Sequence, residues 1–148
     1  MKTEISNQIT RTVKVNLARS AAEALKATGR NLYEVDYKVA NEMPKSENEV
    51  TEIIFFNRKI KHKVNEDELK KEYDLLKLKP VDPYSLCALD EMDPSFAGKY
   101  PYATIWKDKD GKWCFAKFPS WRLRGTIVHL GHCSCNYDDG WWFAGVRA

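Results

Sequence analysis

The residues best suited to chemistry lie close together near the C-terminal end of the chain. Four of them, His129, His132, Cys133 and Cys135, fall within seven positions. Imidazole and thiolate groups are the ligands that zinc prefers in proteins. The spacing lacks the two separated ligand pairs typical of zinc sites, and in an extended chain His132 would face away from the two cysteines. These four residues are therefore metal candidates that we do not favour, and we expect no cofactor.

A thiol and an imidazole can also form a nucleophilic pair when a third group orients the imidazole. Cys114 and His129 are predicted on neighbouring strands and are the pair that could do this. Free cysteine is more often a small buried hydrophobic residue. A chain with four cysteines and three histidines offers such pairs by chance. We assign no catalytic residue, and an enzyme is not the favoured interpretation.

Aromatic and basic side chains are concentrated in the C-terminal third. All five tryptophans lie beyond residue 105, and no Asp or Glu occurs between Gly111 and Tyr137. Aromatic and basic groups side by side suit a protein interface and equally suit stacking on nucleic-acid bases. A packed core and a solvated basic face are the ordinary explanations. The binding residues that this pattern predicts are Trp113, Lys117, Trp121, Arg122, Arg124 and Trp142.

Strand alternation decides how these aromatic residues are displayed. In an extended strand, Trp141 and Phe143 face opposite to Trp142, just as Trp113 faces opposite to Cys114. Both faces of the predicted sheet therefore carry bulky side chains. We expect one of the two faces to be exposed.

The pattern of the C-terminal segments that carry these residues predicts an antiparallel sheet. Asp108 to Gly111 separates two alternating stretches, and an Asp-Gly pair there predicts a hairpin between residues 103–107 and 112–118. Residues 126–130 and 141–146 are predicted to form two further strands. This sheet is expected to occupy most of the last third of the chain.

The N-terminal and middle parts read as short helices with two strands. Ser20 and Glu23 form a capping-box pattern, and an Asp-Pro pair at Asp82 is typical of a helix start. The expected strands are 10–17, with Val13, Val15 and Leu17 inward, and 50–56. The expected helices are 21–28, 31–43, 65–76, one that begins at Pro83, and a short turn from Pro94 to Gly98.

These elements predict an α+β fold in which short helices pack on a mainly antiparallel sheet formed largely by the aromatic-rich C-terminal third. A length of 148 residues with 43% hydrophobic and 30% charged residues predicts a single domain over 1–148, with 1–9 as a flexible tail. No apolar run approaches the roughly 20 residues that a membrane span requires. With no secretory signal, we expect a cytoplasmic location, reduced cysteines and no membrane partner.

Four segments resemble those of small uncharacterised proteins encoded by phages, prophages and other mobile elements. They are Asn16 to Ser20, Asp82 to Leu86, Trp106 to Phe115, and Gly140 to Arg147. The resemblance implies an origin in such an element. It implies no activity and no site residues.

Together these patterns favour a non-catalytic binding protein of a phage or mobile element. Its partner would be a host or phage protein, engaged through an aromatic and basic face of the C-terminal sheet. The alternative is a nucleic-acid-binding module that uses Lys117, Trp121, Arg122 and Arg124. A zinc protein or a Cys-His enzyme is the less favoured third interpretation.

Overall fold

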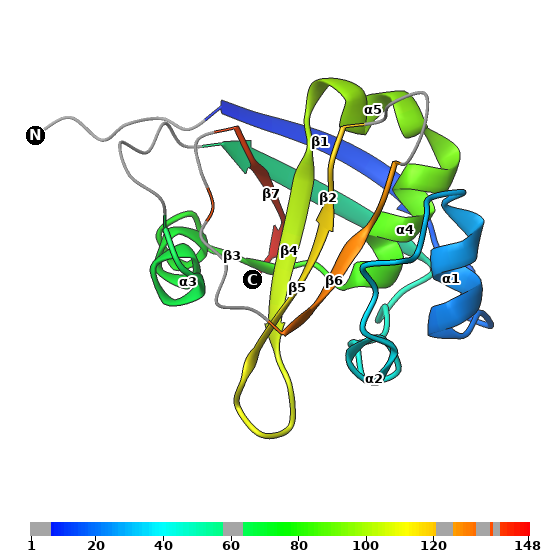
Figure 1. Cartoon of the computed structure of the whole chain (residues 1–148). Coiled ribbons are helices and arrows are strands. Elements are labelled where there is room, and N and C mark those ends of the chain that lie inside the picture. The colour runs from blue at the N-terminus through cyan, green and yellow to red at the C-terminus, as the bar shows by residue number, and fades with distance from the viewer. Residues whose placement is uncertain (1–6, 58–63, 121–125, 133–136, 138–139) are drawn as a thin grey trace, which may run out of the picture.

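The computed structural model describes residues 7–57, 64–120, 126–132, 137 and 140–148, and Figure 1 shows their arrangement. Strands and helices follow one another as β1 (Asn7–Lys14), α1 (Ala21–Ala27), α2 (Tyr37–Ala40), β2 (Val50–Asn57), α3 (Glu66–Leu75), β3 (Leu78–Pro80), α4 (Pro83–Met92), α5 (Pro94–Lys99), β4 (Tyr102–Lys107), β5 (Trp113–Phe118), β6 (His129–His132) and β7 (Trp142–Arg147). The predicted α+β class is confirmed.

One mainly antiparallel sheet carries all of these strands. Its order is β1-β2-β7-β4-β5-β6, and β3 pairs with the last residues of β7. The contact between β4 and β7 is parallel, and every other named pair is antiparallel. The strand nearest the C-terminus therefore lies inside the sheet, with β2 on one side and β4 on the other.

The two faces of the sheet are covered unequally (Figure 1). Helices α1, α2, α4 and α5 pack on one face, which we call the helix-rich face, over Phe55, Tyr102 and Ala116. Helix α3 packs on the other, the α3 face, over Phe56, Ile105 and Phe143. Consecutive strand residues alternate between the two layers, as the period of two requires.

The hairpin between β4 and β5 forms as predicted. The Asp108 carboxylate accepts hydrogen bonds from the backbone N–H groups of Asp110 and Lys112, each at 2.9 Å. Gly111 takes a positive φ of 79° that a residue with a side chain adopts only under strain. The loop extends beyond the rest of the sheet (Figure 1).

Three helix starts form where the capping patterns place them, whereas the same spacing at Asn31 and Glu34 starts no helix. Ser20 and Glu23 close a capping box on α1, and Asn65 and Glu68 close a second on α3. The Asp82 side chain caps α4, in which Pro83 is the first residue. These devices need only residues three apart, which explains why they are readable from sequence.

Two N-terminal predictions need correction. Strand β1 begins at Asn7, so that residues 7–9 belong to the sheet and not to a tail, and it ends at Lys14. Leu17, expected on the buried face, is 52% exposed because the chain has already left the strand. Val13 and Val15 are buried as predicted.

The helix predicted over residues 31–43 is mostly wrong. Only α2 is helical there, with Asp36 as its N-cap. Before it, Asn31 and Val35 form parallel bridges with Ile127 and Leu130. The segment thus runs along the outer edge of β6 and satisfies backbone groups that would otherwise face solvent, a role that a helix could not fill.

None of the helices in the described ranges combines the length and the apolar character that crossing a bilayer demands. The longest, α3 and α4, have ten residues each.

Candidate functional site

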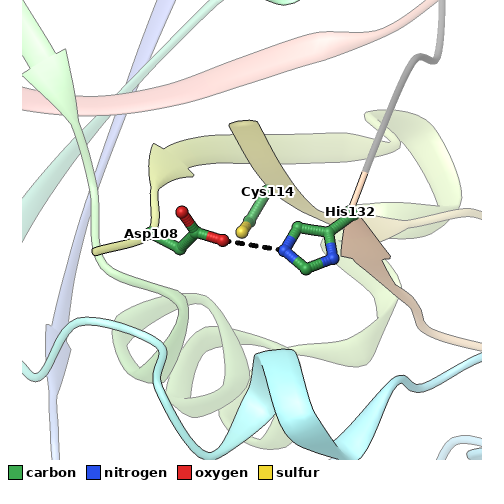
Figure 2. Close-up of side chains that lie close together, drawn as sticks. All are labelled: Asp108, Cys114 and His132. Atoms are coloured by element: carbon green, nitrogen blue, oxygen red, sulfur yellow. Dashed lines mark hydrogen bonds and ion pairs between the residues drawn. The ribbon is translucent and has the colours of Figure 1, made fainter. Parts of the chain in front are cut away.

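Three side chains with metal-binding or catalytic chemistry converge at the base of the β4–β5 hairpin. Asp108, Cys114 and His132 each place one oxygen, sulfur or nitrogen atom within 4.8 Å of the others. Figure 2 shows the Cys114 sulfur beside the hydrogen bond that joins the other two side chains. We call these three residues the Asp-Cys-His cluster.

Strand register brings the cluster together on the helix-rich face. Cys114 of β5 lies directly opposite His132 of β6, and on its other side it lies opposite Trp106 of β4. Asp108 follows two residues after Trp106, where the hairpin turn begins. Three segments of the sheet therefore contribute one ligand atom each, and the backbone ladder fixes their spacing.

Asp108 is a firmly oriented carboxylate. One oxygen accepts the two turn N–H groups, and the other lies 2.8 Å from Nε2 of His132. The hydrogen bond from His132 and those from the Lys112 and Asp110 backbone lower the pKa of Asp108 below its ordinary value of 3.8. The carboxylate is ionised at neutral pH and can only accept, so that Nε2 of His132 carries the proton of this bond.

Cys114 is a poor nucleophile in this setting. Its side chain is 1% exposed, and burial together with the negative charges of Asp108, Glu42 and Asp36 raises its pKa to about 11. Its sulfur donates to the Lys112 carbonyl at 3.8 Å. A Cys-His relay needs the imidazole to accept from the thiol and a thiolate that forms readily near neutral pH. The cluster has neither, and the geometry does not support covalent catalysis.

The metal-binding candidates predicted from the sequence do not come together in the structure as one site. His129 and His132 lie on opposite faces of the sheet, since His129 pairs with Lys117 and His132 with Cys114. Cys133 and Cys135 lie outside the described residues. The pairing of Cys114 with His129 considered for nucleophilic catalysis is not formed; the histidine opposite Cys114 is His132.

Asp108 was read from the sequence only as a turn residue. The Asp-Gly hairpin signal sets the register that puts Asp108 on the face of Cys114, and that signal could have found this half of the cluster. The register of β6 is set across a long connection, and no local pattern reveals it.

A second candidate surface lies on the α3 face, where aromatic rings surround Lys117. We call Trp113, Phe115, Lys117, Tyr137 and Trp141 the aromatic face. Phe115 and Tyr137 are buried, whereas Trp113, Lys117 and Trp141 are half-buried. Its outer layer is therefore two indole rings and one ammonium group on a buried aromatic floor.

Lys117 is held in place by three aromatic rings of this face. Its Nζ lies 4.5 Å from the ring centre of Tyr137, 5.3 Å from that of Trp141 and 5.6 Å from that of Phe115. These are cation–π distances, each of which is worth about 0.5–1 kcal/mol at partly exposed sites. The lysine thus lies across the rings instead of extending freely into solvent.

Trp113 is fixed from two sides. Its indole Nε1 donates to Asp67 of α3 at 2.9 Å, and the ammonium group of Lys107 lies 4.8 Å from its ring centre. The indole therefore bridges β5 and α3. It cannot turn without breaking that hydrogen bond.

His129 borders the aromatic face on β6. Its imidazole stands edge-on to the Phe115 ring, with 4.8 Å between the ring centres, and its Nε2 lies 4.0 Å from Glu34. Burial lowers the pKa of His129, Lys117 adds to the decrease, and Glu34 opposes it. His129 is therefore mainly neutral at neutral pH.

The six binding residues predicted from the sequence do not share one surface. Trp113 and Lys117 both belong to the aromatic face. Trp142 lies on the helix-rich face, where its ring packs edge-on against Tyr100 at 5.0 Å. Trp121, Arg122 and Arg124 lie outside the described residues. Trp141, which was not among the six, joins Trp113 and Lys117.

No protein-family model, curated protein or solved structure matches the chain. Function is therefore inferred from its side chains alone.

Proposed function

We propose that the chain is a non-catalytic binding protein that recognises an acidic surface of a partner protein through its aromatic face. The observation that carries the proposal is the pair of half-buried indoles on the same face as Lys117: Trp113, fixed by its hydrogen bond to Asp67, and Trp141, whose ring lies under the Lys117 ammonium group. Residues of this kind supply most of the binding energy at protein interfaces, because large rigid rings lose little conformational entropy on binding.

Charge favours an acidic partner. Lys107 and Lys117 point their ammonium groups over indole rings of this face. Two carboxylates of α3 border this face, and both already accept hydrogen bonds from it: Asp67 from the Trp113 N–H and Glu66 from the Tyr137 hydroxyl. A carboxylate of the partner can pair with each lysine while its apolar neighbours cover the rings.

The same contacts argue against a nucleic-acid partner. Base stacking needs an uncovered aromatic ring face. In this structure one face of Trp113 carries Lys107, and one face of Trp141 carries Lys117. Bases could stack on those two ring faces only after displacing the lysines. We therefore do not propose nucleic-acid binding as a second function, and the experiment below measures it as an alternative result.

A cytoplasmic location belongs to the same proposal. It is supported by Cys87 and Cys114, which are free thiols in the described part of the chain. The mobile-element origin stays a prediction, and no partner identity is drawn from it.

Affinity capture with matched variants tests the proposed function. Proteins bound by the wild-type chain are identified, purified and titrated against Lys117→Glu, Trp141→Ala and the control Trp142→Ala, whose ring lies on the other face of the sheet. We expect Lys117→Glu and Trp141→Ala to weaken binding at least about tenfold, as truncation of an interface anchor does. Trp142→Ala should bind as the wild type does. Circular dichroism checks that each variant is folded.

Two results would overturn the proposal. The first is a partner that binds the wild type, Lys117→Glu and Trp141→Ala equally well. The second is binding of single- or double-stranded oligonucleotides whose affinity falls steeply between about 50 and 200 mM salt, which is the behaviour of a phosphate-binding surface.

A further inference from the structure

We propose that the Asp-Cys-His cluster binds one divalent transition-metal ion, with zinc as the fitting physiological metal. The ligand atoms are a carboxylate oxygen of Asp108, Sγ of Cys114 and an imidazole nitrogen of His132. A mixed set of oxygen, sulfur and nitrogen donors suits a borderline-soft ion such as zinc or cobalt and does not suit magnesium or calcium. This inference is independent of the aromatic face, which lies on the other side of the sheet.

The spacing of the ligand atoms is close to that of a tetrahedral site. Zinc bond lengths of about 2.0–2.3 Å place neighbouring ligand atoms roughly 3.3–3.5 Å apart. In the cluster, Oδ2 of Asp108 and Nε2 of His132 are 2.8 Å apart, and all three ligand atoms lie within 4.8 Å of one another. An ion enters when the Asp108–His132 pair opens by about half an ångström and the Cys114 sulfur closes on the pair by up to roughly 1.3 Å.

The local charge favours a cation. Besides Asp108, Asp36 lies beside β6, where its backbone N–H donates to the Leu130 carbonyl at 2.8 Å. These carboxylates attract a divalent ion, which deprotonates the Cys114 thiol on binding. Two ligand charges, from Asp108 and Cys114, then balance the charge of the ion.

The surroundings orient the ligands in advance. Oδ1 of Asp108, the oxygen that does not face His132, accepts hydrogen bonds from the backbone N–H groups of Asp110 and Lys112. Partners of this kind fix the direction of metal ligands and commonly raise metal affinity by about 10–100-fold.

The site has an entrance from solvent. The His132 side chain is 49% exposed and that of Asp108 is 11% exposed, whereas Cys114 lies beneath them at 1%. An ion therefore approaches over the imidazole and reaches the sulfur last. The three described ligands leave the fourth tetrahedral position open to water or to another donor.

Cobalt titration tests the site directly. Co(II) bound to a thiolate gives a charge-transfer absorption band, and zinc displaces it, so that both affinity and sulfur ligation are measured on the reduced full-length chain. We expect one ion per chain in the wild type. Cys114→Ser should abolish the band, and His132→Ala and Asp108→Asn should each weaken binding at least about tenfold, since losing a ligand costs no less than losing a group that orients one.

Matched controls separate ligand loss from structural damage. His129→Ala removes an imidazole from the same strand on the opposite face, and Asp110→Asn removes a carboxylate from the same turn. Both should keep wild-type affinity. If Cys114→Ser proves unstable, the zinc-induced increase in Tm is compared between the wild type and His132→Ala, whose replaced ring is half-exposed.

Absence of stoichiometric cobalt binding by the wild type would overturn the proposal. So would a thiolate band that survives in Cys114→Ser and disappears in a Cys133→Ser, Cys135→Ser double variant. A His132→Ala chain with the full zinc-induced increase in Tm would do the same.

Discussion

Arg30 and Asp90 form a fully buried ion pair, in which Arg30 Nε lies 2.6 Å from Asp90 Oδ2 and Arg30 Nη2 lies 3.0 Å from Asp90 Oδ1. Both side chains are 0% exposed. The remaining guanidinium nitrogen, Nη1 of Arg30, donates to the carbonyls of both Pro119 and Ile127, each at 2.8 Å. One side chain thus joins α4 to the ends of the connection between β5 and β6, whose middle residues include Trp121 to Gly125.

Removing the carboxylate of this pair should be costly. Asp90→Ala leaves the Arg30 guanidinium buried without its counter-charge, and we expect the free energy of unfolding to fall by about 3–5 kcal/mol. Urea denaturation followed by circular dichroism measures the loss. Glu91→Ala, which removes the neighbouring exposed carboxylate, is the control and should cost less than about 1 kcal/mol. Equal small losses in both variants would contradict the prediction.

Two glycines should respond oppositely to alanine. A Cβ at Gly145 would lie 2.9 Å from the Lys79 carbonyl oxygen and 3.0 Å from Cε1 of Tyr73, whereas one at Gly98 of α5 would meet nothing within 4 Å. Gly145→Ala should therefore destabilise the protein by about 1–3 kcal/mol. Gly98→Ala should be neutral or stabilise it by up to about 1 kcal/mol, because alanine is the better helix former. Thermal denaturation of both variants measures these changes in stability. A Gly145→Ala variant as stable as the wild type would contradict the prediction and show that β3 and β7 separate easily.

The Arg19–Glu91 pair predicts a pH effect. Arg19 donates to Glu91 at 2.7 and 3.3 Å, and this hydrogen bond holds the pKa of Glu91 below its ordinary value of 4.5. Arg19→Met should raise that pKa toward 4.5, which a carboxyl NMR titration measures. Since the folded pKa is the lower one, ionised Glu91 adds stability above about pH 4.5 that is lost as pH falls through its folded pKa.

The stability difference between the wild type and Arg19→Met should accordingly shrink in acid. It should stay below about 1 kcal/mol at neutral pH, because both side chains are partly exposed. An unchanged Glu91 titration in Arg19→Met would show that the pair does not persist in solution.

Cys114 should react slowly with thiol reagents in the metal-free protein. A thiol with a pKa of about 11 is almost entirely protonated at neutral pH, and its side chain is 1% exposed. Burial raises the pKa of Cys87 as well. Pulse labelling with iodoacetamide and peptide mass spectrometry should show both cysteines protected until denaturant is added. Labelling of Cys114 at the rate of a free cysteine peptide would rule out the buried geometry of the cluster.

Local signals in the sequence predicted most of the elements. The capping box at Ser20, the N-cap at Asn65, the Asp-Pro start at Asp82 and the Asp-Gly turn at Gly111 all act over three or four residues, and each forms as expected. They depend on backbone groups that must find partners wherever the element lies in the fold. For this reason they can be read before any tertiary contact is known.

The rest depended on contacts between distant segments. Residues 31–36 carry a helical pattern, yet Asn31 bridges to Ile127 and Val35 to Leu130 of β6, about a hundred residues later in the chain. Leu78 to Pro80 is too short to show a strand period and pairs only because β7 passes beside it. The Asp-Cys-His cluster needs the β5–β6 register, which places His132 opposite Cys114 and which no local pattern in the sequence reveals.

The position of β7 has a consequence for the order in which the molecule is made. The strand nearest the C-terminus, Trp142–Arg147, joins the β1–β2 pair to the β4–β5–β6 group. A ribosome produces both of these portions before it produces the strand that connects them. Until then, the strand edges that pair with β7 have no partner strand. The whole sheet can assemble only after residues 142–147 have been synthesised. During translation, the edges of β2 and β4 are the parts of the nascent chain that need protection from wrong pairing.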